Sequence, residues 1–283
     1  MSDWQLDTVR RILSTHKGLV SSVVLTVVAL AGVLAPIISP YSFSEQDLGG
    51  AAQQPSLQHW LGTDEFGRDL LTRIMYGART SLTVAVVSIG ASVVVGVILG
   101  AVAAYYGGVL DRIIITIVDL IWSFPDILIA LLFIAIVGPG LKGTMIAISV
   151  AYLAQFARLG RSQVLSLRGE MFVEAARSLG ASNRHVLLKH LVPNAISPVV
   201  VAGMLAVGDA IILEATLGFF GLGAQPPIPS WGAMMASGTA QLFNAPWIII
   251  FPGLAIITTV IGINLLGDAL IHALNIRDRV RTT

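Results

Sequence analysis

Residues 170–194 read EMFVEAARSLGASNRHVLLKHLVPN and form the longest polar interval after Thr80, between two strongly apolar segments. Within it, Phe172 to Leu179 is Ala-rich and contains no Gly or Pro, a composition that favours a helix. Gly180 follows, and Gly readily takes the left-handed conformation with which many helices end. The first half of this stretch therefore predicts a short helix that stops at a glycine.

The second half of the same stretch predicts another short helix. Ser182 is placed to cap a helix over residues 183–191, because a Ser side chain accepts a hydrogen bond from a free backbone N–H at a helix start. Pro193 is expected to end that helix before the next apolar run. Two short helices at a membrane face would form a projecting surface to which a soluble partner could bind.

The composition predicts a membrane protein rather than a soluble one. The chain has 283 residues, of which 55% are hydrophobic and 12% charged, and its mean hydropathy is +0.83. A soluble domain carries about 25% charged residues. The net charge of +1 gives no attraction to nucleic acid. Because there is no Cys, disulfides, thiolate metal sites and thiol catalysis are excluded.

The apolar runs predict an all-α membrane protein with six transmembrane helices. A spanning helix needs about 20 apolar residues, and backbone that faces lipid must satisfy its own hydrogen bonds. The first run is expected to be a retained helix rather than a cleaved signal, because no small-residue cleavage site follows it. The predicted helices cover about residues 19–38, 81–105, 113–137, 143–159, 195–220 and 247–270.

The Lys and Arg residues predict the orientation, since cytoplasmic loops are enriched in them. With the N-terminus inside, 13 of the 17 Lys and Arg residues fall in inner segments or at their boundary. Both termini are therefore expected to be cytoplasmic. The expected segments are a cytoplasmic start (1–18), a first helix with an outer loop (19–80), a five-helix core (81–270) that contains a cytoplasmic loop (160–194), and a cytoplasmic tail (271–283).

Four acidic residues fall inside the predicted spans, where carboxylates are costly and usually face protein or water. Asp119 and Asp126 flank Pro125, which should kink or break the third helix. They either line a substrate path or are tied to neighbouring helices. Asp209 and Glu214 lie on different faces of the fifth helix, so one is expected to face the path or a partner and the other to be bonded within the chain.

The outer loop contains a second cluster of charges. Asp64, Arg68 and Asp69 either contact an external partner or form a network that pins the loop to the membrane domain. Gly62 and Gly67 permit tight bends around them.

Glu174-Ala175-Ala176, Gly180 and Pro193 resemble the EAA loop of ABC-transporter importer permeases. The chain departs from that pattern at two positions, where His190 replaces Ile and Val192 replaces Leu. The resemblance implies a type I importer permease fold in which this loop docks into a cytoplasmic ATPase. Its implied contact residues are Glu174, Ala175, Ala176, Gly180, Ser182, Arg184 and Pro193.

Two longer stretches resemble the dipeptide, oligopeptide and nickel permeases, specifically their second permease subunit. They are HWLGTD with GRD (59–69) and EATLGFFGLGAQPP with SWG (214–232). In this reading Asp64, Arg68, Asp69 and Trp231 are candidate outer-loop contacts. The run at residues 274–277, LNIR, departs from the family's usual Leu-Asp-Pro-Arg ending.

The resemblance implies a permease subunit that imports short peptides, with nickel chelates as the alternative substrate. Its partners would be a second permease, two ATPases that hold ATP and Mg²⁺, an extracytoplasmic binding protein and the lipid bilayer of the bacterial inner membrane. The chain contains no Gly-x₄-Gly-Lys-Ser/Thr sequence, so no ATPase activity or cofactor of its own is expected.

Two other functions remain open at this point. An intramembrane enzyme would need paired acids or a metal-ligand set, and none is visible in the sequence, because all five His residues lie outside the predicted helix interiors. An autonomous channel or secondary transporter would need no ATPase partner. The absence of a visible inverted repeat argues against it.

Overall fold

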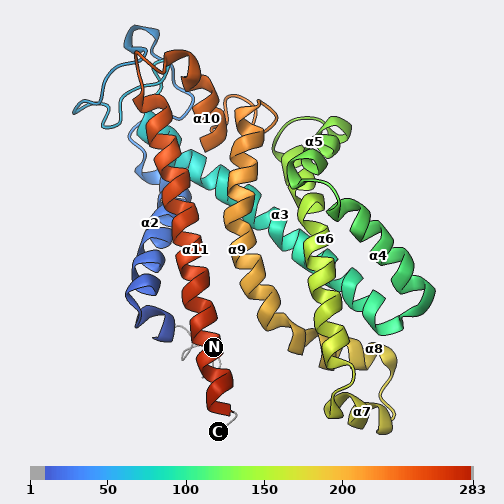
Figure 1. Ribbon diagram of the computed structural model, residues 1–283. Helices are drawn as coiled ribbons and strands as arrows, with labels where there is room; N and C mark the ends of the chain where they lie inside the picture. Colours follow the sequence, from blue (N-terminus) through green and yellow to red (C-terminus); the bar gives the residue numbers. More distant parts are fainter. Residues whose placement is uncertain (1–9, 282–283) are drawn as a thin grey trace. The chain divides into compact units, whose positions relative to one another are not determined.

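The structure, a computed structural model, describes the backbone of residues 10–281 and the side chains of residues 10–273. Apart from an isolated β-bridge between Thr63 and Asp69, helices form all the regular structure of this part. The all-α prediction is confirmed. The helices of ten residues or more are α2 (His16–Ile38), α3 (Leu70–Tyr106), α4 (Gly108–Trp122), α5 (Asp126–Val137), α6 (Leu141–Leu167), α9 (Val192–Phe219) and α11 (Trp247–Arg281) (Figure 1).

The predicted count of six spans is not matched exactly. Among the described residues, four helices are long and apolar enough to cross a membrane, namely His16–Ile38, Leu70–Tyr106, Asn183–Phe219 and Trp247–Ala273. A fifth span results only if α4 and α5 are counted together, and these two helices meet at an angle of 99°.

The predicted third and fourth helices explain the difference. The third breaks between Trp122 and Asp126, as Pro125 suggested, because proline lacks the N–H that would continue the hydrogen-bond ladder. The fourth is part of α6, whose apolar stretch is interrupted by Gln155 and Arg158. Polar residues near one end thus leave α6 short of a full apolar span.

The chain divides into two compact units. The first unit contains residues 1–86, 137–144 and 204–283, and the second contains residues 87–136 and 145–203. Helices α3 and α9 each begin in one unit and end in the other. Each unit is therefore built from segments that are in contact in space but are not consecutive in the sequence.

In the first unit, α2 and α11 pack against each other and run in opposite directions (Figure 1). Glycines permit close approach: a Cβ at Gly262 would lie 3.1 Å from the side chain of Leu25. Gly32 similarly meets the backbone of Arg79 on α3. The short helix α10 (Trp231–Gly238) packs against α11.

In the second unit, α3 packs tightly on α6. A Cβ at Gly96 would lie 2.8 Å from the carbonyl oxygen of Leu153, so only Gly fits there. The Ser92 hydroxyl donates a 2.7 Å hydrogen bond to the carbonyl of Ser149, which adds a polar tie. Small residues at a helix contact are typical of packing in membranes. The approach is also close at Gly100, whereas Gly90 faces open space.

Candidate functional site

The 170–194 stretch folds as two short helical pieces, as predicted. The first is α7 (Met171–Ser178), and it ends in a left-handed glycine, since Gly180 has φ +83°. The Gly180 N–H donates to the carbonyl of Arg177 and the Ala181 N–H donates to the carbonyl of Ala176, at 2.9 and 3.1 Å. This pair of bonds is the Schellman arrangement, which fixes the direction in which the chain leaves α7.

The second piece begins where the sequence predicts and ends differently. The Ser182 hydroxyl accepts a 3.3 Å hydrogen bond from the His185 N–H and so caps α8 (Asn183–His185). A π-helical segment (Val186–Leu191) follows and continues directly into α9.

The expectation that Pro193 ends this helix was therefore wrong. Pro193 follows immediately on the wide π turn, where the hydrogen-bond register changes and the Val192 N–H donates to the carbonyl of Leu187. Pro193 is the second residue of α9, and proline is tolerated in the first turn of an α-helix. The Asn194 side chain donates a 2.6 Å hydrogen bond to the carbonyl of His190 at the same point.

The inner face of this loop is anchored to the end of α3. Val173 and Ala176 of α7 are buried in one apolar cluster with Ala101 and Ala104 of α3, together with Val164, Val186, Leu187 and Leu191. The Tyr105 hydroxyl donates a 2.8 Å hydrogen bond to the side chain of Asn183. The loop and the end of α3 thus form one packed body.

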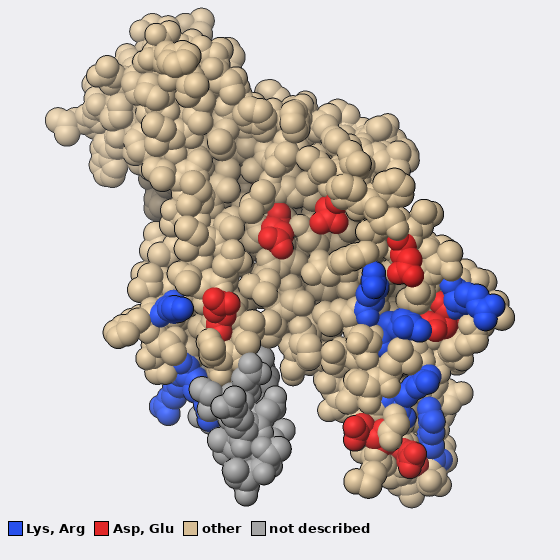
Figure 2. All heavy atoms as spheres, in the orientation of Figure 1, with Lys and Arg blue, Asp and Glu red and all other residues tan. Residues whose placement is uncertain are grey.

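The outer face of the loop is exposed and has a different character. Glu174, Ala175 and Arg184 are exposed, and so are the large apolar side chains of Met171 and Leu179, at 84% and 89%. Ala176 alone among the predicted contact residues is buried within the chain. On the face drawn in Figure 2, Lys, Arg, Asp and Glu side chains gather over α4, α6 and α7.

A bidentate ion pair joins two helices of the second unit. The Arg161 guanidinium donates to both oxygens of Asp111, each at 2.7 Å, and so joins α6 to α4. Nearby, Arg158 lies 3.7 Å from Asp119 and over the ring of Trp122, with both charged side chains about half exposed. The sequence offered no signal for the Arg161–Asp111 pair, since 50 positions separate its members.

Within each unit, the two acids of the predicted spans lie apart from each other. Asp119 of α4 lies near Arg158 of α6. Asp126 is the first residue of α5, on the other side of the 99° bend between α4 and α5. On α9, Asp209 is exposed and Glu214 is fully buried, so the prediction that they do not share a face is confirmed. Within the described part, no group of three or more His, Asp or Glu side chains is arranged to hold a metal ion.

Glu214 lies in an unusual environment in the first unit. The hydroxyls of Ser81 on α3 and Ser230 before α10 are close to its carboxylate, yet neither carboxylate oxygen is in hydrogen-bond geometry with a described residue. A buried polar group without a partner is costly.

The outer-loop candidates are buried and paired with one another. Asp64 accepts hydrogen bonds from Arg68 Nε at 2.6 Å and lies 3.2 Å from Arg73 Nε. Asp69 pairs with His59 Nδ1 at 2.9 Å. Trp231 is 1% exposed and donates from its indole to the carbonyl of Ile74. These contacts favour the network interpretation over direct contact with an external partner.

Comparison with known proteins identifies the family. The family model described as "binding-protein-dependent transport system inner membrane component" matches residues 92–279. The chain belongs to this family. A second model, the N-terminal transmembrane domain of oligopeptide transport permease C, matches residues 2–55. The importer permease predicted from the EAA-like loop and the two longer stretches is thereby confirmed, and the chain is a multi-pass membrane protein.

Individual relatives of this permease cover nearly its full length. It is 39% identical to the dipeptide transport system permease protein DppC of Alkalihalophilus pseudofirmus, over 97% of this chain and 90% of the relative. It is also 39% identical to the glutathione transport system permease protein GsiD of Escherichia coli O157:H7, over 94% and 88% of the two chains.

Solved structures show the same fold. An inward-facing crystal form of the MetNI methionine ABC transporter (SeMet soak) has a chain that matches with a TM-score of 0.59 at 21% identity, covering 71% of this permease and 95% of that chain. The native crystal form matches with a TM-score of 0.57 at 23% identity, covering 70% and 94%.

Proposed function

We propose that this permease is the membrane subunit of an ATP-driven importer of short peptides in the bacterial inner membrane. The observation that carries the proposal is the match to relatives named as permeases for a dipeptide and for glutathione, itself a tripeptide, over nearly the whole chain. Its partners would be a second permease, two ATPases with their ATP and Mg²⁺, and an extracytoplasmic binding protein. Nickel chelates are less favoured, because neither relative is named for them.

The exposed face of α7 is the proposed docking surface for an ATPase. Met171, Glu174 and Ala175 share one face of the helix at i, i+3 and i+4, opposite the buried Val173. An exposed apolar side chain next to a carboxylate suits a helix-in-groove contact. Ala176 would contribute indirectly, because it lies on the buried face of α7 and packs this helix against the rest of the chain.

The anchoring of the loop suggests how movement would reach the membrane. Because Val173 and Ala176 pack on Ala101 and Ala104, a shift of α7 must displace the end of α3 or break the cluster. The Arg168 guanidinium also donates to the carbonyl of Ala104, at 3.2 Å. Packed elements of this kind move as rigid bodies between discrete arrangements. Residues 160–194 would thus transmit the ATPase movement to α3.

The sidedness is part of the same proposal. Residues 1–18, 160–194 and 271–283 would be cytoplasmic, and the loop within 39–80 would face outward, as the distribution of Lys and Arg predicts. Of the intramembrane acids, the exposed Asp119, Asp126 and Asp209 would line the path, and the buried Glu214 would be structural. An autonomous channel is not favoured, since it would have no use for a docking loop.

ATP-dependent uptake of a labelled dipeptide by vesicles that contain the complex with its native neighbours tests the proposal. Glu174→Lys should abolish uptake and release the ATPases while the permease still inserts, because it reverses a charge on the docking face. Gly180→Pro should have the same effect, because proline has no N–H to donate to the carbonyl of Arg177 and cannot adopt the φ of +83° that Gly180 has. Glu45→Lys makes the same charge change on the exposed outer loop and is the control.

Normal uptake by a stably assembled Gly180→Pro complex would refute the docking role. Uptake by this chain alone, without ATPases or ATP, would refute the importer itself and leave an autonomous transporter.

A further inference from the structure

Two histidine side chains lie against each other on the second helical piece of the 170–194 stretch. His185 is the last residue of α8, and His190 belongs to the π-helical segment that follows. Their ring centroids are 5.5 Å apart. His185 is exposed and His190 is half-buried, so an ion in solution can reach the pair. Neither residue belongs to the docking surface proposed above, which is the exposed face of α7.

The π turn explains why these two rings meet. In an α-helix, five residues correspond to about 500°, so side chains at i and i+5 point about 140° apart. In a π-helix the hydrogen bonds join residues i and i+5, and side chains at this spacing become neighbours. Val186 and Leu191 of the turn are buried in the apolar cluster, and the Asn194 side chain bonds to the carbonyl of His190. The pairing of the rings thus goes with a backbone that is packed in place.

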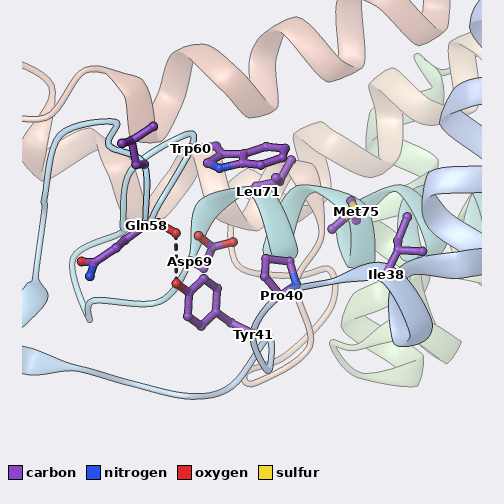
Figure 3. A pocket seen from close by; sticks show the side chains of 9 residues that line it. Ile38, Pro40, Tyr41, Gln58, Trp60, Asp69, Leu71 and Met75 are labelled. Atoms are coloured by element: carbon purple, nitrogen blue, oxygen red, sulfur yellow. Dashed lines mark hydrogen bonds between the residues drawn. The ribbon is translucent and has the colours of Figure 1, made fainter.

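The nitrogens of both rings are free to bind a ligand. None of the described residues forms a hydrogen bond or an ion pair with either imidazole. His59 on the outer loop differs, since its Nδ1 already pairs with Asp69 at 2.9 Å. Asp69 is the one charged residue that lines the pocket of about 720 Å³ drawn in Figure 3, and its second oxygen accepts from the Thr72 N–H at 2.8 Å. That pocket therefore offers no free charged group, whereas the His185–His190 pair offers two free ligands.

The spacing of the two rings fits one shared metal ion. A zinc ion lies about 2.0–2.1 Å from an imidazole nitrogen and therefore about 3.2 Å from the ring centroid. Two rings bound at a tetrahedral angle then have centroids about 5.2 Å apart, close to the observed 5.5 Å. Rotation of the side chains is sufficient to turn one nitrogen of each ring toward a common ion. Neutral imidazole suits Zn²⁺, Ni²⁺ and Cu²⁺, whereas Mg²⁺ prefers oxygen ligands.

The surroundings set the strength of such a site. Within the described part of the chain, no third His, Asp or Glu joins the pair, and the exposed cations Arg184 and Lys189 are next to the two histidines in the sequence. Water would supply the other ligands, so binding is weaker than at structural zinc sites with four protein ligands. We propose that His185 and His190 form a two-histidine site for a divalent ion of the Zn²⁺, Ni²⁺ and Cu²⁺ class, which ties the end of α8 to the π turn.

Calorimetric titration of the purified, chelator-free complex with Zn²⁺ tests this inference. Loss of a group that merely supports a metal ligand costs about 10–100-fold in affinity, so His185→Ala and His190→Ala should each weaken this binding event at least about tenfold. Lys189→Ala is the matched control, because it shortens a neighbouring side chain of the same turn without removing a ligand. It should leave the affinity unchanged or raise it, since it removes a cation that repels the ion.

Hydrogen exchange locates the ion and does not depend on the other subunits. Zn²⁺ should slow the exchange of the N–H groups of residues 186–192 in the native chain and in Lys189→Ala, but in neither histidine variant, and Mg²⁺ should slow it in none of them. Unchanged exchange in this segment, or equal Zn²⁺ affinity in the native chain and either histidine variant, would overturn the two-histidine site. Neither measurement requires uptake or ATP hydrolysis, so a negative result here would leave the importer proposal intact.

Discussion

The contact between α3 and α6 gives the sharpest test of the structure, through the substitution Gly100→Ala. A Cβ at Gly100 would overlap the carbonyl oxygen of Ala157 and would lie 2.7 Å from the Arg161 nitrogen and 2.9 Å from the Ala157 carbonyl carbon. All three atoms belong to the helix backbone, so no side chain can rotate away. The two helices must separate to accept one methyl group.

The expected cost follows from known overpacking effects. Extra methyl groups in a well-packed core cost about 1–3 kcal/mol. Since 1.4 kcal/mol is a factor of ten, the ratio of folded to unfolded protein should fall roughly 5- to 150-fold. The strain also falls next to Arg161, so the Arg161–Asp111 pair should loosen with the contact.

The assay is the thermal unfolding of the purified complex, followed by size exclusion after heating. Gly90→Ala is the matched control, because it makes the same change ten residues earlier in the same helix, where no heavy atom lies within 4 Å. We expect a lower Tm for Gly100→Ala and an unchanged or higher Tm for Gly90→Ala, since Ala favours a helix over Gly by about 1 kcal/mol. Equal Tm values for the two variants would refute the packing of α3 on α6.

Three further predictions use the same complex. Asp111→Asn should lower the free energy of unfolding by about 1 kcal/mol, because the Asp111–Arg161 pair is partly exposed. The double variant Asp111→Arg with Arg161→Asp restores a pair of opposite charges and should recover part of the lost Tm, which a purely local effect of either substitution would not allow. Ser182→Ala should remove about 1 kcal/mol of capping and raise hydrogen exchange at residues 183–186, and unchanged exchange there would contradict the cap. Glu214→Gln should leave the Tm nearly unchanged, because it replaces a buried carboxyl group that makes no hydrogen bond with a described residue by an amide of nearly the same volume; a large fall in Tm would mean that the carboxyl group has a partner.

Local patterns were sufficient wherever the cause lies within a few residues. The α7 helix, its end at Gly180 and the cap at Ser182 depend on helix propensity, backbone freedom and a hydroxyl three positions from its donor. The break at Pro125 depends on a missing N–H. Local reasoning was wrong at Pro193, where a π turn precedes the proline and two residues of that turn, Val186 and Leu191, are buried in the apolar cluster with the end of α3.

The amino-acid sequence by itself determined the class of this protein: a multi-pass helical membrane permease with a helical loop of the EAA type. Hydropathy, glycine placement and the motif are all readable along the chain. The tertiary structure alone decided which side chains face each other. It buried Ala176, Trp231 and the Asp64 network, left Met171 and Leu179 exposed, and joined Arg161 to Asp111. Such pairings depend on how distant helices pack, and a sequence pattern specifies one face of a helix without specifying what covers it.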